Sequence, residues 1–360
     1  MWWRGFPAKD AFVDYAEPVR IVQFSDDPKL WDDYVDRHPA GTIYHRQDWR
    51  KVIEQSFGYE CPSLAALSGS TIIGVLPMTI VKSPFFGTYI TSCAFSDYGG
   101  ICSNDNTSAQ MLLNAGITMA KDVKARSLEL RHVLPLNLSN LSTNTKKVLS
   151  VLELPDSEEV LWKAFDSKLR NQIRKAMKGG MSIRWGHEEL LSDFYGIFLR
   201  NMRDLGTPAP GIEFFKHIVK IHGKAADVLV LYQGDIPISG AVALTYRNAM
   251  EVPWASSLRN FFSLLPNNLL YWTLLQKSIA RKFDFFSFGR STVDSSTYMF
   301  KAQWNTQPII LNYQSYACTK ESYGDMTPGN PKYRLAISAW KKMPISLVKK
   351  LGPCVAKGLA

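Results

Sequence analysis

The succession of apolar and polar residues along the chain predicts an α/β protein. Short apolar runs bounded by turn residues predict buried strands, and apolar residues three and four positions apart predict helices. The predicted strands are 20–24, 64–67, 71–81, 89–94, 127–130, 148–154, 228–232, 236–246, 250–255 and 283–288, and the predicted helices are 26–37, 47–57, 108–123, 156–179, 190–204, 212–222 and 267–280. Turn residues at Ser68-Gly69-Ser70 and Gln233-Gly234-Asp235 join two pairs of these strands as hairpins.

The same order of elements occurs twice. Each half has a hairpin, a strand ending in polar residues, a helix, and a strand ending at an arginine, Arg131 in the first half and Arg290 in the second. Gly69 precedes Arg131 by 62 residues and Gly234 precedes Arg290 by 56, so the spacing agrees too. Chance within an α/β chain is the other explanation. We interpret the pattern as two copies of one α/β unit, with domains at 18–150 and 151–318 and a tail at 319–360.

Composition narrows the class of protein. A chain of 360 residues is expected to form two domains. Its five cysteines are scattered, without a CxxC pair, which favours reduced thiols in the cytoplasm and argues against a zinc knuckle. The start of the chain lacks the apolar segment of a secretory signal, and no apolar run reaches the ~18 residues that a membrane span needs.

The positive charge is concentrated near the end of the chain. Of a net charge of +10, seven cations follow Pro331 without one acidic residue. The rest of the protein is only mildly basic, which argues against binding to duplex DNA.

The segment from Asp284 to Trp304 is the strongest candidate site. Gly289 ends a buried apolar run and is followed by a burst of polar groups, as expected where ligands bind beyond the carboxyl ends of strands in an open sheet. The candidate substrate-binding residues here are Arg290, Ser291, Asp294 and Tyr298, with Lys301 beyond them. The alternative is a strand, a Ser/Thr-rich loop and a helix start whose charges are only solvated.

Two further groups of polar residues have two interpretations each. The helix after Asp156 carries a cationic row of Arg170, Arg174 and Lys178, which is either a solvated face or a contact for phosphate or nucleic acid. Arg203 and Asp204 precede the loop 205–210 and are either substrate contacts or helix-end charges.

Several enzyme classes are excluded by missing motifs. The sequence has no GxSxG, HExxH, Walker GxxxxGK[ST] or GxGxxG motif, and its six histidines lack metal-ligand spacing. Hydrolase, zinc-enzyme, kinase and dehydrogenase functions are therefore disfavoured, and no metal site is expected.

Five strings of the sequence resemble FemAB-related proteins, in particular the branch associated with PEP-CTERM/exosortase exopolysaccharide clusters. They are SKLRNQIRKAMK (167–178), NMRDLGTP (201–208), EVPWASS (251–257), PNNLLYW (266–272) and FGRSTVDSSTYMFKAQW (288–304). The resemblance implies two tandem GNAT-like domains, each a mixed sheet flanked by helices. It also implies an acyl- or aminoacyltransferase that acts on a cell-envelope or exopolysaccharide glycan or a peptidoglycan precursor.

The resemblance also assigns residues. Lys301 stands in the Tyr-x-Phe-Lys context of an active-cleft lysine, where it would stabilise a developing oxyanion or bind substrate phosphate. The family's substrate-phosphate arginine is absent, since Ala209-Pro210-Gly211-Ile212 follows the loop, which argues against a UDP-sugar-peptide substrate. No cofactor is expected to stay bound, and the donor is aminoacyl-tRNA or acyl-CoA. The lack of a glycine in 258–268 argues against CoA.

The attacking amine needs a proton acceptor, for which Glu251 and Asp97 are the first candidates, with Asp204 and Asp294 next. Glu251 and Trp254 are predicted on one side of their strand, opposite Ser256, where they are either site residues or cross-sheet partners. Trp254, Ser256 and Asn268 complete the expected substrate-binding set.

The tail interleaves apolar residues with its seven cations, and Pro344 and Pro353 are expected to divide it into short amphipathic helices. It is either a disordered basic tail or an anchor on anionic lipid at the inner face of the cytoplasmic membrane. Three functions stay open: a FemAB-type transferase acting on a lipid-linked or nucleotide-linked glycan precursor with tRNA as donor carrier, an acyl-CoA-dependent N- or O-acetyltransferase, and a non-catalytic glycan- or RNA-binding module.

Overall fold

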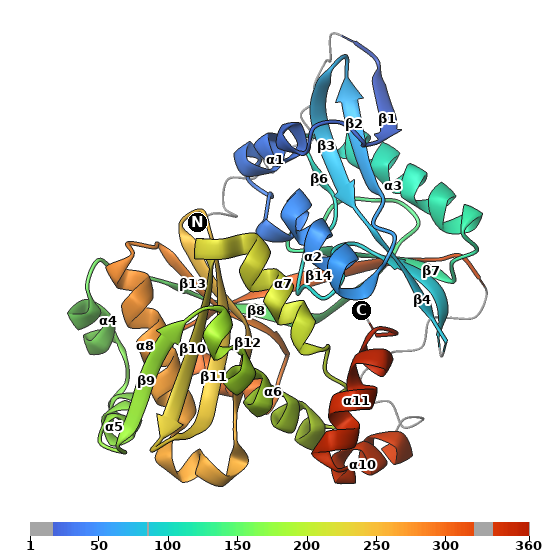
Figure 1. Cartoon of the computed structure of the whole chain (residues 1–360). Coiled ribbons are helices and arrows are strands. Elements are labelled where there is room, and N and C mark those ends of the chain that lie inside the picture. The colour runs from blue at the N-terminus through green and yellow to red at the C-terminus, as the bar shows by residue number, and fades with distance from the viewer. Residues whose placement is uncertain (1–16, 85, 320–333, 360) are drawn as a thin grey trace. The chain divides into compact units, whose positions relative to one another are not determined.

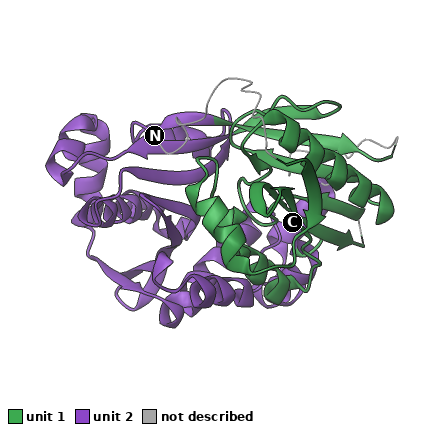
Figure 2. Cartoon of the chain, turned by 90° about the horizontal axis from the view of Figure 1, so that it is seen from above, with its two compact units in different colours: residues 1–147, 310–324, 357–360 green, residues 148–309, 325–356 purple. Residues whose placement is uncertain are grey.

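A computed structural model describes residues 17–84, 86–319 and 334–359. The chain divides into two compact units, coloured separately in Figure 2: residues 1–147, 310–324 and 357–360 form unit 1, and residues 148–309 and 325–356 form unit 2. The boundary at Lys147 and Val148 lies within strand β8 (Ser142–Glu153), near the expected boundary at 150. Residues 310–324 belong to unit 1, although we expected 151–318 to form the second domain.

Unit 1 contains two sheets and the long helix α3. Its elements in chain order are β1 (Val19–Gln23), α1 (Pro28–Arg37), η1 (Ile43–His45), α2 (Gln47–Phe57), β2 (Ser63–Ser68), β3 (Thr71–Pro77), β4 (Thr79–Ser83), β5 (Gly87–Thr91), β6 (Cys102–Ser103), α3 (Asn106–Asp122) and β7 (Ser127–His132), with most of β14 (Gln307–Ala317). One sheet has the order β1-β2-β3-β6, and the other contains β4-β5-β7-β14 and continues to β8. Strand β5 runs parallel to β7, with α3 as the crossover.

Unit 2 contains one sheet with helices on both faces. Its elements are α4 (Glu158–Ala164), α5 (Ser167–Met177), β9 (Met181–Gly186), η2 (Glu188–Leu190), α6 (Leu191–Leu205), α7 (Ile212–His222), η3 (Gly223–Ala225), β10 (Ala226–Gln233), β11 (Ile236–Tyr246), β12 (Ala249–Ser257), η4 (Arg259–Leu264), α8 (Pro266–Ala280), β13 (Phe285–Thr292), α9 (Ser296–Ala302), α10 (Arg334–Lys342) and α11 (Ile345–Ala356). The strand order is β8-β13-β12-β11-β10-β9 (Figure 1). As in unit 1, a helix, here α8, connects two parallel strands, β12 and β13. The duplicated α/β unit predicted from the order of elements is therefore confirmed.

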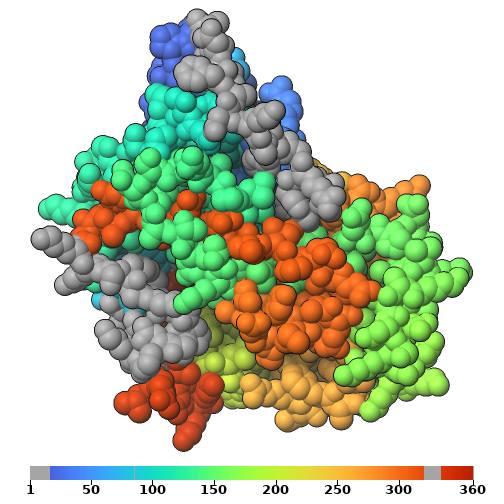
Figure 3. Space-filling view, turned by 180° about the vertical axis from the view of Figure 1, so that it is seen from behind, coloured from blue at the N-terminus to red at the C-terminus, as the bar shows by residue number. Residues whose placement is uncertain are grey.

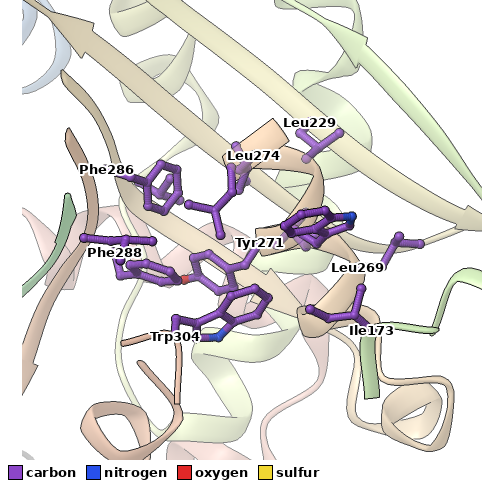
Figure 4. Packing of buried hydrophobic residues seen from close by; sticks show 14 of the residues in the cluster. Ile173, Leu229, Leu269, Tyr271, Leu274, Phe286, Phe288 and Trp304 are labelled. Atoms are coloured by element: carbon purple, nitrogen blue, oxygen red, sulfur yellow. The ribbon is translucent and has the colours of Figure 1, made fainter. Parts of the chain in front are cut away.

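The core of unit 2 is aromatic, and it fixes the end of the candidate segment. Tyr271 on α8 stacks on Phe288 of β13 with ring centroids 4.8 Å apart, and Trp304 lies 5.8 Å from Phe288 (Figure 4). Trp304 is fully buried. Burial of three aromatic rings contributes several kcal/mol, on the order of 2 or more each. This packing holds α9 against the end of β13.

Some predicted elements differ from those observed. The helix predicted from Asp156 to Gly179 is two helices, because Phe165 is extended and Asp166 begins α5 by accepting a 2.6 Å hydrogen bond from the Leu169 N–H. The cap of α4 is Ser157, one residue after the predicted Asp156. The predicted strand 71–81 is divided at Met78 into β3 and β4, which belong to different sheets. Strands β9 and β14 were not predicted.

The tail forms helices that pack on unit 2. Helices α10 and α11 both contact α6, and Val348 of α11 is fully buried. The break predicted at Pro344 is confirmed, whereas the break predicted at Pro353 is wrong, because Pro353 lies inside α11. A disordered basic tail is therefore also wrong for residues 334–359. Across the described ranges, no helix is both long and apolar enough to cross a bilayer.

Candidate active site

The two parallel strands of unit 2 stay paired over a short distance only. β12 and β13 pair from Ala249 with Phe285 to Glu251 with Ser287. Beyond that point β12 continues to Ser257 and β13 to Thr292, and the described residues of the two strands pair no further. We call the diverging ends, Glu251–Ser257 and Ser287–Thr292, the β12–β13 fork. Because backbone polar groups need partners, strand edges that separate in this way offer donors and acceptors to a third group.

Lys301 binds the backbone of β13 at the fork. Its Nζ donates hydrogen bonds of 2.9 Å to the carbonyl oxygen of Gly289 and 2.9 Å to that of Arg290. Successive carbonyls of a regular strand point to opposite sides, but Gly289 has a φ of +74°, and this left-handed turn lets both carbonyls reach one ammonium. Lys301 is buried, with 4% of its surface exposed. The structure thus brings Lys301 to Arg290 through backbone contacts.

A bulge in β12 gathers three predicted site residues on one face. Val242 pairs with Trp254 and Leu244 with Glu251, so Val252 and Pro253 together oppose the single residue between them on β11. Directly paired residues face the same side of a sheet, which places Glu251, Trp254 and Ser256 on one face. The prediction that Ser256 faces the opposite side is therefore wrong. Glu251 is buried at the position where the fork begins.

Helices α6 and α7 cover this face of the sheet. Trp254 packs edge-on against Phe214 and Phe215 of α7, with ring centroids 5.5 Å apart in both pairs. Ser256 Oγ accepts a 3.0 Å hydrogen bond from Asn201 Nδ2 of α6. Asn201 was not among the predicted site residues, although it begins the string NMRDLGTP that carries the family resemblance.

Arg203 and Asp204 form an ion pair with each other at the carboxyl end of α6. The guanidinium lies 2.8 Å from the carboxylate, and both side chains are about three-quarters buried, at 28% exposed. Gly206 closes the helix one residue after Leu205 in the left-handed conformation, at a φ of +82°. The pair is a local one between neighbouring residues, and it lies next to the loop that the tail covers.

The predicted site residues at the end of β13, in the turn after it and in α9 have different surroundings. Ser291 is buried, and its Oγ has no hydrogen-bond partner among the described residues. Arg290 is half-buried. Asp294 is exposed with a φ of +62°, a turn conformation that aspartate tolerates. Tyr298 is half-buried in the first turn of α9, where Ser295 Oγ caps its N–H at 3.2 Å. Asp294 and Tyr298 therefore belong to the turn that leads to Lys301.

Asn268 and the cationic row of α5 lie on the other face of the sheet. Asn268 Nδ2 donates a 3.3 Å hydrogen bond to Gln172 Oε1, which joins the start of α8 to α5. Arg174 is exposed and its guanidinium lies 5.3 Å from the Trp162 ring, while Lys178 is exposed at the helix end. Arg170 is half-buried, and its Nε has no hydrogen-bond partner among the described residues. Figure 3 shows α4 and α5, in light green, on the surface.

The start of α8 has few backbone amides to offer a ligand. Pro266 has no N–H, and the N–H groups of Asn268 and Leu269 donate to the Leu265 carbonyl at 3.0 and 3.4 Å. Asn267 Oδ1 accepts a 2.6 Å hydrogen bond from Ser257 Oγ at the end of β12. A helix start that binds pyrophosphate presents several bare amides, so this one agrees with the missing glycine in arguing against such binding.

Asp97 belongs to unit 1, whereas all other predicted site residues belong to unit 2. Its carbonyl oxygen accepts a 2.5 Å hydrogen bond from the Tyr313 hydroxyl, and Arg131 lies over the Tyr313 ring at 5.6 Å. His132 at the end of β7 is buried, and burial lowers the pKa of its imidazole to about 4. The Gln314 side chain opposes this shift in the pKa. His132 is thus neutral at physiological pH, and its Nε2 accepts a 3.0 Å hydrogen bond from the Ile101 N–H.

The architecture matches known folds over nearly its whole length. A crystal structure of FemX superposes with a TM-score of 0.65 at 14% sequence identity, over 88% of this chain and 100% of that one. A tandem GNAT protein from the clavulanic acid biosynthesis pathway gives a TM-score of 0.58 at 10% identity, over 83% and 98%. The chain has a tandem GNAT-like fold. L-PGS from Bacillus licheniformis is also similar, with a TM-score of 0.50 at 9% identity over 92% and 98%.

A family model matches the part of the sequence that contains the candidate site. Residues 163–301 match the family model described as "Acetyltransferase (GNAT) domain". This segment contains the whole β12–β13 fork, the α5 cations and Lys301, its last residue. No curated protein matches the sequence. A GNAT domain suggests acyltransferase activity, while the branch associated with PEP-CTERM and exosortase stays a prediction.

Proposed function

We propose that this GNAT-like protein is a FemAB-type acyl- or aminoacyltransferase acting on a lipid-linked or nucleotide-linked glycan precursor of the cell envelope or of an exopolysaccharide. The observation that carries the proposal is the β12–β13 fork. Glu251 lies at its origin, and Lys301 secures the β13 branch through two carbonyl groups. Where two strands diverge inside a GNAT-like sheet, their unpaired backbone groups can hydrogen-bond to an extended acyl-donor substrate.

In the proposed reaction, an amine of the acceptor attacks the ester or thioester carbonyl carbon of the donor. An ammonium with a pKa of about 10 must first lose a proton, and Glu251 accepts it. The new C–N bond forms as the C–O or C–S bond breaks, and the second proton that the nitrogen loses passes to the leaving tRNA oxygen or thiol sulfur. Asn201 and Ser256 orient the acceptor on the same face of the sheet as Glu251.

Lys301 is proposed as a positioning residue. Two of its three N–H donors are used by the carbonyls of Gly289 and Arg290, so its charge stabilises the shape of the fork. This differs from the electrostatic catalysis that the family resemblance implied for it. Arg290 and Ser291, held in place by this contact, are proposed to bind the substrate.

Two observations favour aminoacyl-tRNA over acyl-CoA as the donor. The start of α8 has few bare amides for a pyrophosphate. Helix α5 offers Arg170, Arg174 and Lys178, and its Gln172 contacts Asn268 at the start of α8, beyond the end of β12. A cationic row there fits the phosphates of a tRNA acceptor end.

The experiment compares donors on the purified protein. Radiolabelled aminoacyl-tRNA and acetyl-CoA are each incubated with the protein and a crude lipid-linked glycan fraction, and transfer of label and loss of donor are measured. Transfer from tRNA supports the proposal, and transfer from acetyl-CoA alone identifies a CoA-dependent acetyltransferase. Binding of glycan or RNA without turnover of either donor would identify a non-catalytic module and overturn it.

A further inference from the structure

Helices α10 and α11 each have one side that packs on unit 2. Val348, Gly352 and Ala356 are buried along one side of α11. The contact is close, since a Cβ added to Gly352 would lie 3.3 Å from the Ala209 carbonyl oxygen. A Cβ added to Gly206 would lie 2.5 Å from Ile337 Cγ2 of α10. The two helices therefore lie against the carboxyl end of α6 and the loop that follows it (Figure 1).

The other side of these helices is apolar and cationic at the same time. Leu335 is 87% exposed, Leu347 47% and Leu351 43%. Leu347 and Leu351 are four residues apart and share one face of α11. Exposed lysines accompany them at 342 and 350, and residues 334–360 contain no aspartate or glutamate. Figure 3 shows part of this segment, in red, at the surface.

We propose that this outward face docks on the surface of an anionic lipid bilayer. The docking face consists of Leu335, Leu347, Leu351, Lys342 and Lys350. Amphipathic helices with leucine and lysine on the lipid-facing side bind at the boundary between head groups and acyl chains, with lysines against anionic head groups. Nucleic acid would pair with the lysines but gains nothing from three exposed leucines. A second copy of this face is disfavoured because both surfaces are positive.

Docking would hold one side of unit 2 near the lipid. α10 covers the loop that begins at Gly206, two residues after the Arg203–Asp204 pair and five after Asn201, which contacts Ser256. This step alone rests on the proposed transferase function. If that function holds, the acceptor site opens near the bilayer. A lipid-linked glycan precursor is then the acceptor class that this geometry serves.

Flotation of the full chain with vesicles tests the docking face. We expect binding to phosphatidylcholine vesicles containing about one-third phosphatidylglycerol, little binding to pure phosphatidylcholine, and release as salt is raised. The double substitution Leu347→Gln/Leu351→Gln should lower partitioning about tenfold or more, because it removes the inserted apolar groups. The matched control Leu30→Gln/Ile236→Gln changes two residues that are each 54% exposed elsewhere, and should bind as the wild type does.

Charge is tested with Lys342→Gln/Lys350→Gln against Lys220→Gln/Lys224→Gln, which removes the same charge from exposed positions on α7 and η3. Only the first pair should weaken vesicle binding. Cys354 is exposed on α11, so a polarity-sensitive dye attached there in a Cys318→Ser background should shift to the blue with anionic vesicles.

Two results would overturn the proposal outright: no binding of the wild type to anionic vesicles, or equal binding of the leucine variant and its control. A third would indicate an RNA-binding face instead: tRNA displaces the protein from the vesicles, and the leucine substitutions do not change its binding to them. None of these measurements uses a donor, so failure of the transferase function leaves them interpretable.

Discussion

The Lys301 ammonium donates a 2.9 Å hydrogen bond to the carbonyl oxygen of Gly289, twelve residues earlier in the chain. Gly289 lies in the branch of β13 that has left β12, and its left-handed backbone turns its carbonyl and that of Arg290 toward the same cation. The buried ammonium thus has two carbonyl acceptors on the part of β13 that no longer pairs with β12. The same contact links α9, and with it the Trp304 packing, to the candidate site.

Lys301→Met is expected to destabilise unit 2 and to reduce turnover. Methionine keeps much of the apolar stem but leaves two carbonyls without this donor, each at a cost of about 1–3 kcal/mol when buried. We expect a loss of about 2–5 kcal/mol in the free energy of unfolding, measured by urea denaturation. At a temperature where the variant stays folded, kcat should still fall about tenfold or more, because the fork loses its geometry.

Lys163→Met is the control for this change, since Lys163 is exposed on α4. It should alter neither stability nor kcat. A Lys301 variant that unfolds at the same urea concentration as this control would contradict the positioning role.

Glu251→Gln is expected to abolish most turnover without unfolding the protein. Glutamine has the shape of glutamate but cannot accept the proton of the attacking amine, and loss of a general base typically costs about 10²–10⁴ in rate. We expect kcat to fall by that factor while KM for the donor changes little. Glu159→Gln on α4 serves as the control. If the Glu251 variant retained full kcat, the proton acceptor would have to be another group.

Local patterns in the sequence predicted most of the elements, because strand and helix periodicity depend on neighbouring residues. Arg131 and Arg290, which were predicted at the ends of their strands, lie inside β7 and β13. Long-range consequences were harder to predict. Whether Glu251 and Ser256 point to the same side of the sheet depends on the bulge at Val252 and Pro253. Proline inside a strand marks an edge or a bulge, so Pro253 was a signal that could have corrected the prediction.

The division of the predicted helix at Phe165 has a similar explanation. The apolar row Leu161, Phe165, Leu169 fits one helix, and neither glycine nor proline interrupts it. Asp166 nevertheless caps a new helix, because its side chain binds the Leu169 N–H. The role of Lys301 could not be predicted from spacing, since it depends on a carbonyl orientation that the φ of Gly289 sets.

Gly206→Ala is expected to loosen the tail from unit 2. The residue has a φ of +82°, and an added Cβ would lie 2.5 Å from Ile337 Cγ2 and 3.0 Å from Lys341 Cε. The backbone strain costs about 1 kcal/mol, and displacement of α10 adds to it. Hydrogen exchange should become faster in α10 and α11. Gly234→Ala is the matched control, because Gly234 has a φ of +59° but nothing within 4 Å of its Cβ position. Equal exchange in the two variants would mean that α10 does not depend on this contact.

His132 is expected to make the protein less stable in acid. Burial lowers its pKa from 6.5 to about 4 in the folded chain, so the unfolded chain binds a proton in this range that the folded chain does not. The stability contribution is therefore complete above pH ~6.5 and is lost progressively as the pH falls through ~4, by up to about 3 kcal/mol. In His132→Gln, a neutral side chain that can still accept from the Ile101 N–H, urea midpoints measured between pH 7 and 4 should fall less steeply than in the wild type. Carboxylates titrate in both proteins, so the difference between the two slopes isolates the imidazole. Parallel slopes would show that His132 takes up its proton without unfolding unit 1.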